Sequence, residues 1–415
     1  MSEISKELAI IVGIAKKTSE LPECEISLDE LERLLDTAGA KVFARVLQVK
    51  ESYDPRTLIG SGKVAEIKEL VSTGGVSLVV FDEELSPAQI RNLEKDMGDE
   101  VTVIDRSMLI LDIFALHATS GEGKLQVELA QLKYTAPRLI GKGLELSRQG
   151  GGIGTRGPGE SKLETDRRHL HEKVVALECK LKELERSRAT MRAQRDRSGL
   201  PKIALVGYTN AGKSTLLNAL TGAGVLSEDK LFATLDPTTR KFELPSGEQI
   251  LLTDTVGFIR KLPHHLVKAF KSTLDEVRYA DILLVVADVS DPELASQIKV
   301  TMEVIEELGA AGKPIIYVYN KSDRCPEGIS TLPENTVAVS AKLGVGLENL
   351  ISVITDTLYK SKKEVTLLVP YSEQSKVSNI YNEYNVKSTE YIDSGVLIVA
   401  TLDERGLGLY KKFIQ

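Results

Sequence analysis

The chain has 415 residues, of which 42% are hydrophobic and 27% charged, as in ordinary soluble proteins, and this length predicts roughly two to four domains. Its three cysteines are scattered and odd in number, which argues against a disulfide framework and indicates a reducing compartment. The sequence shows neither a signal-peptide pattern nor an apolar run of membrane-spanning length, so we expect a cytoplasmic protein.

Residues 1–120 alternate strand and helix signals. Apolar β-rich runs predict strands at 7–14, 40–49, 76–82 and 101–105. Helical patterns fall between and after them, at 27–39, 62–71, 86–98 and 106–118. Ser27 and Ser86 are expected to cap two of these helices, and Gly39 to end the first. The alternation predicts a small parallel α/β domain.

The run Gly60-Ser-Gly-Lys63 suggests a second nucleotide site, but Thr57 stands where a phosphate-binding loop needs its first glycine. We therefore favour a turn and the start of a helix here. A phosphate or RNA contact through Lys63 is the weaker alternative.

Residues 121–198 have a different pattern. Leucines at helical spacing begin at Leu125, and Pro137 is expected to bend that helix. A second apolar stripe follows at steps of seven, four and three, at Leu163, Leu170, Val174, Leu177, Leu181 and Leu184. Two long helices joined by the glycine-rich residues 150–159 would form an antiparallel hairpin. We interpret the leucine stripe as core packing.

The hairpin segment is basic although the protein is acidic. Residues 133–202 contain 17 Lys and Arg against 9 Asp and Glu, a local charge of +8, which leaves −15 for the rest of a chain whose net charge is −7. The glycine-rich loop is flanked by Arg148, Arg156, Lys162, Arg167 and Arg168. Such a loop could insert into RNA, or could be a solvated linker, and composition does not separate the two. The arginines at 186, 188, 192, 195 and 197 leave the same choice open.

Residues 199–362 contain the strongest signals. Gly207 to Thr215 reads GYTNAGKST between an apolar strand at 202–206 and a helix that continues as LLNAL. This strand, loop and helix context is that of a phosphate-binding P-loop, in which backbone N–H groups face the phosphate. Lys213 would reach the β- and γ-phosphates, and the Ser214 hydroxyl would bind Mg²⁺.

Two further segments match the switches of a GTP-binding domain. Asp254-Thr-Val-Gly257 follows a buried strand, so Asp254 would hold Mg²⁺ through water and the Gly257 amide would contact the γ-phosphate. Thr234, within Phe232-Ala-Thr-Leu-Asp236, is the candidate switch threonine for Mg²⁺ and the γ-phosphate. Lys213, Thr234 and Gly257 are therefore the predicted catalytic residues, and Ser214, Thr234 and Asp254 the predicted metal site.

Asn320-Lys-Ser-Asp323 and Ser340-Ala-Lys342 each end a predicted strand. Asp323 would accept hydrogen bonds from guanine N1 and N2, a donor pair that adenine lacks. The five motifs in this order predict a GTP-binding domain. The predicted nucleotide-binding residues are Gly207, Tyr208, Thr209, Asn210, Ala211, Gly212, Lys213, Ser214, Thr215, Phe232, Ala233, Thr234, Leu235, Asp236, Asp254, Thr255, Val256, Gly257, Asn320, Lys321, Ser322, Asp323, Ser340, Ala341 and Lys342.

The remaining elements complete the outline. A buried strand at 280–290, a helix at 292–309 and a last helix at 347–359 belong to the GTP-binding domain. The charged run 360–364 would link it to a small α+β domain at 363–415, which carries no chemical motif. The predicted architecture is thus α/β, with a Ras-like P-loop domain preceded by a parallel α/β domain and a helical hairpin.

The position that holds a water-orienting glutamine in Ras-like enzymes is Phe258. A phenyl ring cannot hydrogen-bond to water, so we expect slow intrinsic hydrolysis that a partner or a switch rearrangement accelerates. His264 and His265 follow in the same segment and could position water, but we favour a structural or switch role for them.

The motifs together resemble one family. The run GGIGTRGPGESKLETDRR at 151–168, read with GYTNAGKST, LFATLDPTTR and DTVGFIRKLPHHLVKAFKSTL, is similar to HflX, the ribosome-associated GTPases of the OBG-like group, over nearly the whole chain. Ser161 stands where the family pattern has Thr, a change that does not touch phosphate chemistry. The resemblance implies GTP and Mg²⁺ binding, and association with the 50S subunit through its 23S-type rRNA near the peptidyl-transferase centre.

The resemblance also implies hydrolysis stimulated by that subunit, and a role in splitting or rescuing stalled ribosomes under stress. It favours the RNA interpretation of the basic loop. The alternatives are a GTPase acting on another RNA, such as a tRNA in maturation, and an RNA-binding scaffold with a vestigial GTPase. We expect a monomer in the cytoplasm, with peripheral association at the membrane as a variant.

Overall fold

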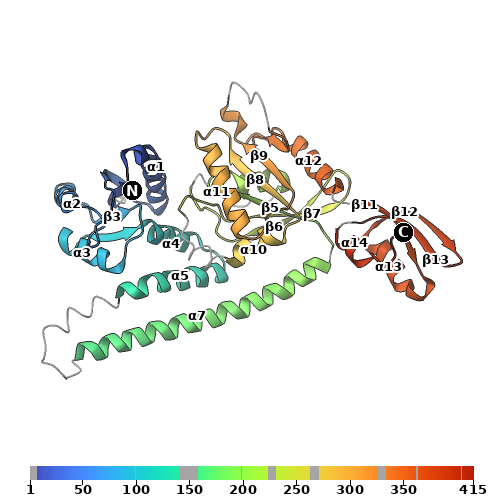
Figure 1. The fold of residues 1–415 in the computed structure, drawn as a ribbon, viewed down its shortest axis with the longest axis horizontal. Coiled ribbons are helices and arrows are strands. Elements are labelled where there is room, and N and C mark those ends of the chain that lie inside the picture. The colour runs from blue at the N-terminus through green and yellow to red at the C-terminus, as the bar shows by residue number, and fades with distance from the viewer. Residues whose placement is uncertain are drawn as a thin grey trace.

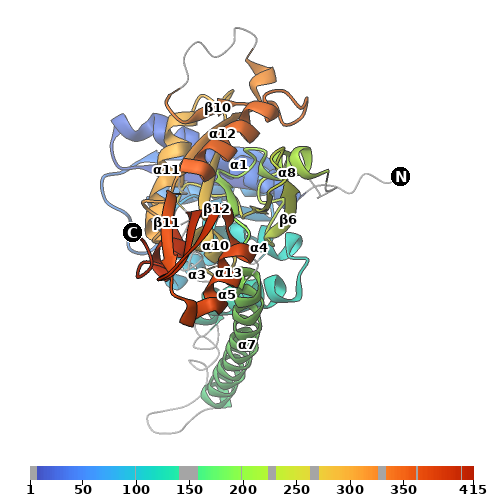
Figure 2. The same ribbon diagram turned by 90° about the vertical axis from the view of Figure 1, so that its right-hand side faces the viewer.

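The computed structural model describes residues 7–98, 100–139, 158–197, 199–222, 230–261, 271–325, 333–360, 363–402 and 404–415. An amino-terminal sheet domain and a central sheet domain lie side by side, with the carboxy-terminal domain beyond the central one (Figure 1). Two antiparallel helices run beneath the first two domains, and Figure 2 shows the longer helix projecting away from the sheets.

The amino-terminal sheet has the strand order β2-β1-β3-β4, and all of its pairings are parallel. This confirms the parallel α/β prediction. The elements are β1 (Leu8–Ala15), α1 (Leu21–Ala38), β2 (Lys41–Val49), α2 (Ser61–Gly74), β3 (Leu78–Phe81), α3 (Pro87–Met97), β4 (Thr102–Asp105) and α4 (Arg106–His117). Apolar side chains pack on both faces of the sheet, as is usual for a parallel sheet that helices cover on both sides.

The prediction for α1 was wrong at its amino end. The helix begins at Leu21, with Pro22 in its first turn, so Ser27 lies inside it rather than capping it. The Ser27 hydroxyl is buried and donates to Asp82 Oδ2 at 2.7 Å. Gly39 ends the helix in the left-handed conformation at φ 91°, as predicted. Thus a serine that reads as a cap belongs to a buried polar cluster.

Two other helix starts follow the expected chemistry. Ser86 and Gln89 form a reciprocal capping box on α3, with Pro87 in the first turn. Gly60 is the N-cap of α2, so the glycine-rich run there is a turn and helix start, as favoured. Lys63 pairs with Glu66 at 2.8 Å within α2.

The hairpin consists of α5 (Gly121–Leu139) and α7 (Pro158–Arg197). Leu177 of α7 is buried, and Leu170, Val174, Leu181 and Leu184 are half-buried, as a packing stripe requires. Among the described residues, three ion pairs also join the helices: Glu122–Arg188 at 2.8 Å, Glu128–Lys173 at 2.7 Å and Lys133–Glu178 at 2.7 Å. Residues 150–157 of the glycine-rich loop lie outside the described residues.

The central domain is a six-stranded sheet with the order β10-β9-β8-β5-β7-β6, in which only β6 pairs antiparallel. Residues from both faces form its core. Its elements are β5 (Lys202–Gly207), α8 (Lys213–Thr221), β6 (Thr238–Glu243), β7 (Gln249–Asp254), α10 (Lys271–Tyr279), β8 (Ile282–Asp288), α11 (Leu294–Glu307), β9 (Ile315–Asn320), β10 (Thr336–Ala338) and α12 (Leu347–Lys360).

The carboxy-terminal domain is an antiparallel sheet of order β11-β13-β12 with its own core. It contains β11 (Lys363–Val369), α13 (Gln374–Glu383), β12 (Asn385–Ile392), β13 (Gly395–Leu402) and α14 (Glu404–Leu409), in agreement with the predicted α+β tail. Among the helices that the structure describes, none is long and apolar enough to cross a membrane.

One apolar core crosses the boundary between the first two sheet domains. Leu111 and Phe114 of α4 pack in the same cluster as Tyr208, Phe232 and Val256 of the central domain. The two domains therefore share buried surface instead of being joined by a linker alone, and the shared part includes the predicted switch segments.

Candidate nucleotide-binding site

The loop between β5 and α8 needs its two bounding glycines. Gly207 has φ +151°, and a Cβ there would lie 2.1 Å from the carbonyl oxygen of Val286. Gly212 has φ +89°, and its Cβ would lie 2.3 Å from Nδ2 of Asn320. Both conformations and both close approaches exclude other residues, and the resulting curved backbone is the form that surrounds a phosphate.

Lys213 begins α8 and lies beneath the loop. Its side chain is buried, and Nζ donates to the carbonyl oxygens of Tyr208 at 2.9 Å and Gly207 at 3.2 Å. Burial lowers the pKa of Lys213 to about 8, while the charge of Asp254 opposes that shift. A phosphate in the loop would restore the full charge, so the ammonium is placed for an anion.

Three oxygen-bearing side chains meet beside the loop. The Ser214 hydroxyl lies 2.6 Å from Asp254 Oδ2 and 2.8 Å from the hydroxyl of Thr234. Asp254 is fully buried, and among the described residues its Oδ1 has no hydrogen-bond partner. Burial raises the pKa of Asp254, with Lys213 and Ser214 opposing. A buried orphan carboxylate oxygen next to two hydroxyls fits a hard divalent cation such as Mg²⁺.

The segment expected to bind the base is tied to the loop. Asn320 Nδ2 donates to the carbonyl oxygen of Ala211 at 3.0 Å, and its Oδ1 accepts from the Ala341 amide at 3.0 Å. Ser340 Oγ donates to Asp323 Oδ1 at 2.5 Å and lowers the pKa of that carboxyl group. Lys321 Nζ pairs with Asp288 at 2.8 Å. The two base motifs therefore form one surface next to the phosphate loop.

The structure brings eleven of the 25 predicted nucleotide-binding residues to one pocket. It is lined by Thr209, Asn210, Gly212, Lys213, Ser214, Thr215, Lys230, Phe232, Ala233, Thr234, Thr255 and Gly257. Leu235 and Val256 do not line it, and their side chains are buried in the core shared with the amino-terminal domain. Lys230 is a lining residue that the motifs did not indicate.

Thr209 of the loop holds both switch segments. Its hydroxyl accepts from the backbone amide of Phe232 at 2.8 Å, and its own amide donates to the carbonyl oxygen of Phe258 at 2.7 Å. A Cβ on Gly257 would lie 2.6 Å from the Thr209 Cα, so only glycine allows this approach. The loop and the two switches are therefore one packed unit.

Asp236 was expected at the nucleotide, but the structure places its carboxylate elsewhere. Oδ2 accepts from the backbone amides of Thr119 at 3.1 Å and Ser120 at 2.7 Å, and both hydroxyls donate to the same carboxylate. These residues precede α5. Burial would raise the pKa of Asp236, but the hydrogen bonds from Ser120 and Thr119 hold it below its usual value. No sequence signal indicated this partner, because 116 residues separate it from Ser120.

Phe258 is 1% exposed and packs in the core with Leu274 and Val277. Its ring therefore does not face the pocket, in agreement with a packing role. His264 and His265 lie outside the described residues. Phe232 is also buried, and its ring meets Phe114 of α4 edge-on with centroids 4.8 Å apart and an interplanar angle of 81°.

A mostly parallel sheet with this loop and these switch segments defines the class of P-loop guanine-nucleotide-binding proteins. Three family models match in chain order, GTP-binding GTPase N-terminal at residues 25–115, GTP-binding GTPase Middle Region at 117–195 and 50S ribosome-binding GTPase at 202–321. The chain belongs to the HflX family of GTPases, and it hydrolyses GTP.

Curated relatives named GTPase HflX span nearly the whole chain. The protein from Lacrimispora saccharolytica is 49% identical over 94% of this chain and 92% of its own length, and that from Caldanaerobacter subterraneus subsp. tengcongensis is 50% identical over 95% and 91%. The Escherichia coli K12 protein is 44% identical over 85% and 84%. A solved GTP-binding protein from Sulfolobus solfataricus in complex with GDP is 27% identical, with 86% of this chain and 99% of that chain covered and a TM-score of 0.44.

Proposed function

We propose that this GTPase is a molecular switch that binds the large ribosomal subunit through its helical hairpin. The observation that carries the proposal is a continuous connection. Thr234 lies beside Ser214, where Mg²⁺ is expected. Asp236, two residues later, accepts a hydrogen bond from the backbone amide of Ser120, which directly precedes α5. A nucleotide that orders the segment around Thr234 therefore acts on the attachment of the hairpin.

In this proposal Ser214 and Thr234 hold Mg²⁺ directly and Asp254 holds it through water. The ion neutralises charge on the phosphates when bound. The chain's own contribution is positional. Lys213 contacts the β- and γ-phosphates, the Gly257 amide faces the γ-phosphate, and Asp323 selects guanine. Removing Mg²⁺ with a chelator should raise the dissociation constant for GTP. An unchanged constant would contradict the assignment of the three oxygen ligands.

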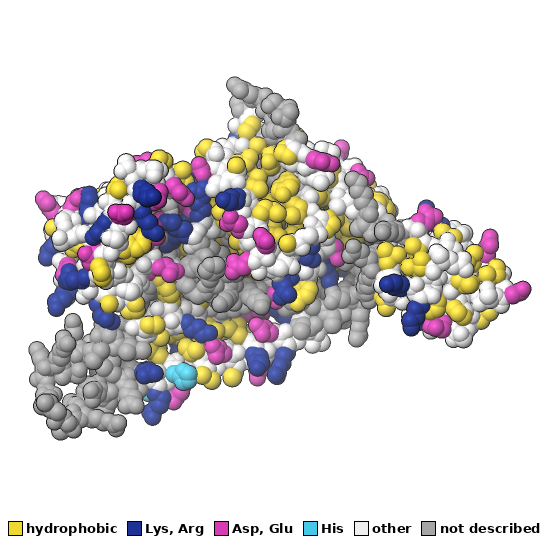
Figure 3. Space-filling model, viewed as in Figure 1, with side chains coloured by type: hydrophobic (Ala, Val, Ile, Leu, Met, Phe, Trp, Pro, Cys, Tyr) yellow, Lys and Arg dark blue, Asp and Glu magenta, His cyan; other side chains and the backbone are white. Residues whose placement is uncertain are grey.

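The ribosomal part rests on two supports. The family model that covers residues 202–321 is described as a 50S ribosome-binding GTPase. The segment from 133 to 202 carries 17 basic against 9 acidic residues, with glycines that let backbone approach phosphates. On the face in Figure 3 the described basic side chains are interspersed with acidic ones. The proposal therefore assigns the rRNA contact to residues 150–159.

The finer proposal is that GTP-bound protein splits or rescues stalled ribosomes under stress, as a cytoplasmic monomer. Residues 1–120 would set the state of the switches, 121–198 would contact 23S-type rRNA, 199–362 would bind and hydrolyse GTP, and 363–415 would form the separate tail domain. A GTPase acting on another RNA is the alternative.

The test is GTP turnover by the full chain with and without purified 50S subunits. A variant with residues 150–159 shortened is compared with a charge control, Arg148→Gln with Arg156→Gln, at full loop length. We expect strong stimulation that the shortened loop abolishes and the control reduces. Normal GTP binding without stimulation, together with no co-sedimentation, would contradict the ribosomal proposal. Stimulation that survives shortening would move the rRNA contact elsewhere.

A further inference from the structure

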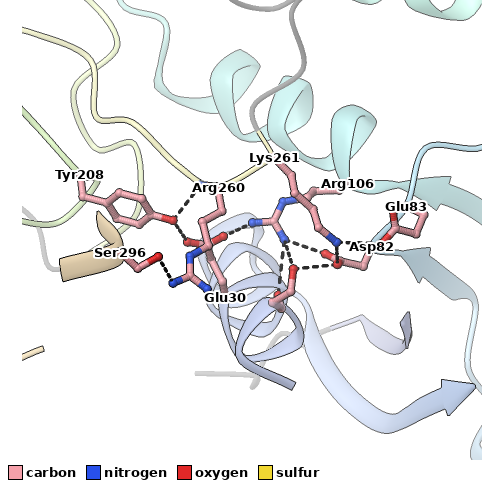
Figure 4. Close-up of polar contacts among 9 residues, drawn as sticks. Glu30, Asp82, Glu83, Arg106, Tyr208, Arg260, Lys261 and Ser296 are labelled. Atoms are coloured by element: carbon pink, nitrogen blue, oxygen red, sulfur yellow. Dashed lines mark hydrogen bonds and ion pairs between the residues drawn. The ribbon is translucent and has the colours of Figure 1, made fainter. Parts of the chain in front are cut away.

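A chain of buried and partly buried polar contacts joins the amino-terminal domain to the second switch, and Figure 4 shows it between α1, the ends of β3 and β4, and the segment after Gly257. It begins and ends at consecutive residues of that segment. In order, the contacts run through Lys261, Asp82, Arg106, Glu30, Tyr208 and the backbone amide of Arg260.

The Tyr208 hydroxyl is the link on the nucleotide side. It donates to Glu30 of α1 and accepts from the backbone amide of Arg260 at 2.7 Å. Tyr208 is 5% exposed, and it does not line the phosphate pocket. The neighbouring backbone pairs with the same segment, because the Phe258 amide donates to the carbonyl oxygen of Gly207 at 3.0 Å. The switch backbone is therefore held at Phe258 and at Arg260.

Lys261 is the link on the other side. Its backbone is left-handed at φ 51°, and Nζ reaches Asp82 at 2.5 Å and Glu83 at 2.7 Å. The Asp82 side chain is completely buried, whereas that of Lys261 is 43% exposed. Burial would raise the pKa of Asp82, but Arg106 and Lys261 together hold it below its usual value.

Arg106 joins the two links. It is 2% exposed and is paired with both Glu30 and Asp82. If Lys261 moved away, the buried guanidinium of Arg106 would face the buried carboxylate of Asp82 and the partly buried carboxylate of Glu30, and one negative charge would be left uncompensated. Such a loss is costly in a low-dielectric interior. The amino-terminal domain therefore favours one position of the switch.

We propose that Tyr208 and Lys261 are positioning residues for GTP hydrolysis, which fix the segment Gly257–Lys261 against the carboxylates of Glu30 and Asp82. The ring of Phe258 is buried and cannot orient water. The segment Gly257–Lys261 therefore contributes to hydrolysis through the position of its backbone. In the same structure the hydroxyls of Thr234 and Ser214 lie 2.8 Å apart. The contacts of Tyr208 and Lys261 are therefore compatible with a closed nucleotide site, and we infer that they preorganise it.

This inference rests on the GTPase activity and not on the ribosomal proposal. The first test is Tyr208→Phe in the full chain, which removes the hydroxyl and keeps the ring. The matched control is Tyr317→Phe in β9. The Tyr317 hydroxyl donates a long hydrogen bond of 3.8 Å to the sulfur of Met302, so its removal should change little. Single-turnover hydrolysis of GTP and the dissociation constant of a fluorescent GTP analogue are measured for each.

We expect Tyr208→Phe to lower the single-turnover rate about 5- to 10-fold, the effect of roughly one hydrogen bond, with the dissociation constant within about twofold of wild type. The control should match wild type. An unchanged rate, or a rate that falls only in proportion to nucleotide affinity, would overturn the positioning role.

A second variant keeps the inference testable if Tyr208→Phe folds poorly. Lys261→Met retains the aliphatic stem of a partly exposed side chain, and Lys261→Arg retains the charge. We expect Lys261→Met to slow GTP hydrolysis and Lys261→Arg to retain most of the wild-type hydrolysis rate. Because both links hold one segment, the double variant Tyr208→Phe with Lys261→Met should be less than additive. Fully additive losses, or no rescue by Arg, would refute the shared role.

Discussion

The carboxylate of Asp236 accepts hydrogen bonds from both the backbone amide and the hydroxyl of Ser120, at 2.7 Å and 2.5 Å. Ser120 directly precedes α5, so an acidic residue of the first switch lies at the positive end of a hairpin helix. The same residue type serves as a helix cap in many proteins, but here it comes from another domain. The nucleotide site and the hairpin are thereby joined through one side chain.

Asp236→Ala should loosen the start of α5. Losing a helix-capping carboxylate costs about 1 kcal/mol, so amide hydrogen exchange at residues 121–124 should accelerate roughly fivefold. Asp393→Ala, an exposed change in the turn between β12 and β13, is the control and should leave those amides unaffected. Wild-type exchange rates in Asp236→Ala would show that the contact does not stabilise the hairpin.

Lys213→Ala should weaken GTP binding by about 100-fold or more, because it removes a charged donor from the phosphates. The fold should persist, since burial of this ammonium is itself unfavourable, as its lowered pKa indicates. Equilibrium binding of a labelled nucleotide and a thermal melt provide the two readouts. Lys299→Ala, on the exposed side of α11, is the control. Wild-type affinity in Lys213→Ala would refute the assignment of the phosphate loop.

Asp323→Asn should abolish the preference for guanine. The carboxylate accepts from Ser340 at 2.5 Å, and it would also accept the guanine N1 and N2 protons. The amide presents one donor and one acceptor there, so GTP affinity should fall roughly 100-fold while affinity for xanthosine triphosphate, which has an oxygen at that position, rises. Competition binding with the two nucleotides measures this, with Asp393→Asn as control. A retained preference for GTP would place base recognition elsewhere.

Phe258→Ala should destabilise the central domain by about 3–5 kcal/mol, because the ring is buried among Leu274 and Val277. Phe258→Leu should cost far less and keep hydrolysis within about threefold of wild type, since neither side chain can bind water. Chemical denaturation and single-turnover hydrolysis test the pair. A collapse of hydrolysis in a well-folded Phe258→Leu protein would restore a direct role for the ring.

The ion pair between Lys261 and Asp82 should contribute to stability over a defined pH window. The pKa of Asp82 is lowered in the folded protein by Arg106 and Lys261 against its burial, so its contribution is present above about pH 4 and lost as the pH falls through the lower folded value. The pKa of Lys261 is raised by Asp82 and Glu83 against its burial, so its contribution is lost only above about pH 10.5.

The difference in melting temperature between wild type and Lys261→Met should therefore be constant from about pH 5 to 9 and should shrink below about pH 4. The pKa of Glu30 shifts in the opposite direction to that of Asp82, because burial raises it while the positive charge of Arg106 opposes the rise. Glu30 is present in both proteins, so the difference in melting temperature reports the ion pairs that Lys261 makes with Asp82 and Glu83. A difference that grows at low pH would contradict the lowered pKa of Asp82.

Local chemistry was sufficient for much of this protein. Ser86-Pro87 and Gly39 marked helix ends correctly, since capping and left-handed backbone depend on a few adjacent residues. The loop from Gly207 to Thr215 was recognisable because phosphate binding needs glycine, lysine and serine at fixed spacing on one strand–loop–helix unit. The order of the motifs and the resemblance to HflX determined the class and the reaction.

Only the tertiary structure decided what the remaining polar residues do. Ser27 resembles a helix cap but donates to a buried aspartate 55 positions later. Asp236 was predicted to contact the nucleotide, but its carboxylate accepts hydrogen bonds from Thr119 and Ser120, just before α5. Tyr208 occupies a variable position of the loop, yet it joins α1 to the second switch. These pairings depend on how two domains pack, and a hydrogen bond between distant segments leaves no periodic or spacing signal in either one.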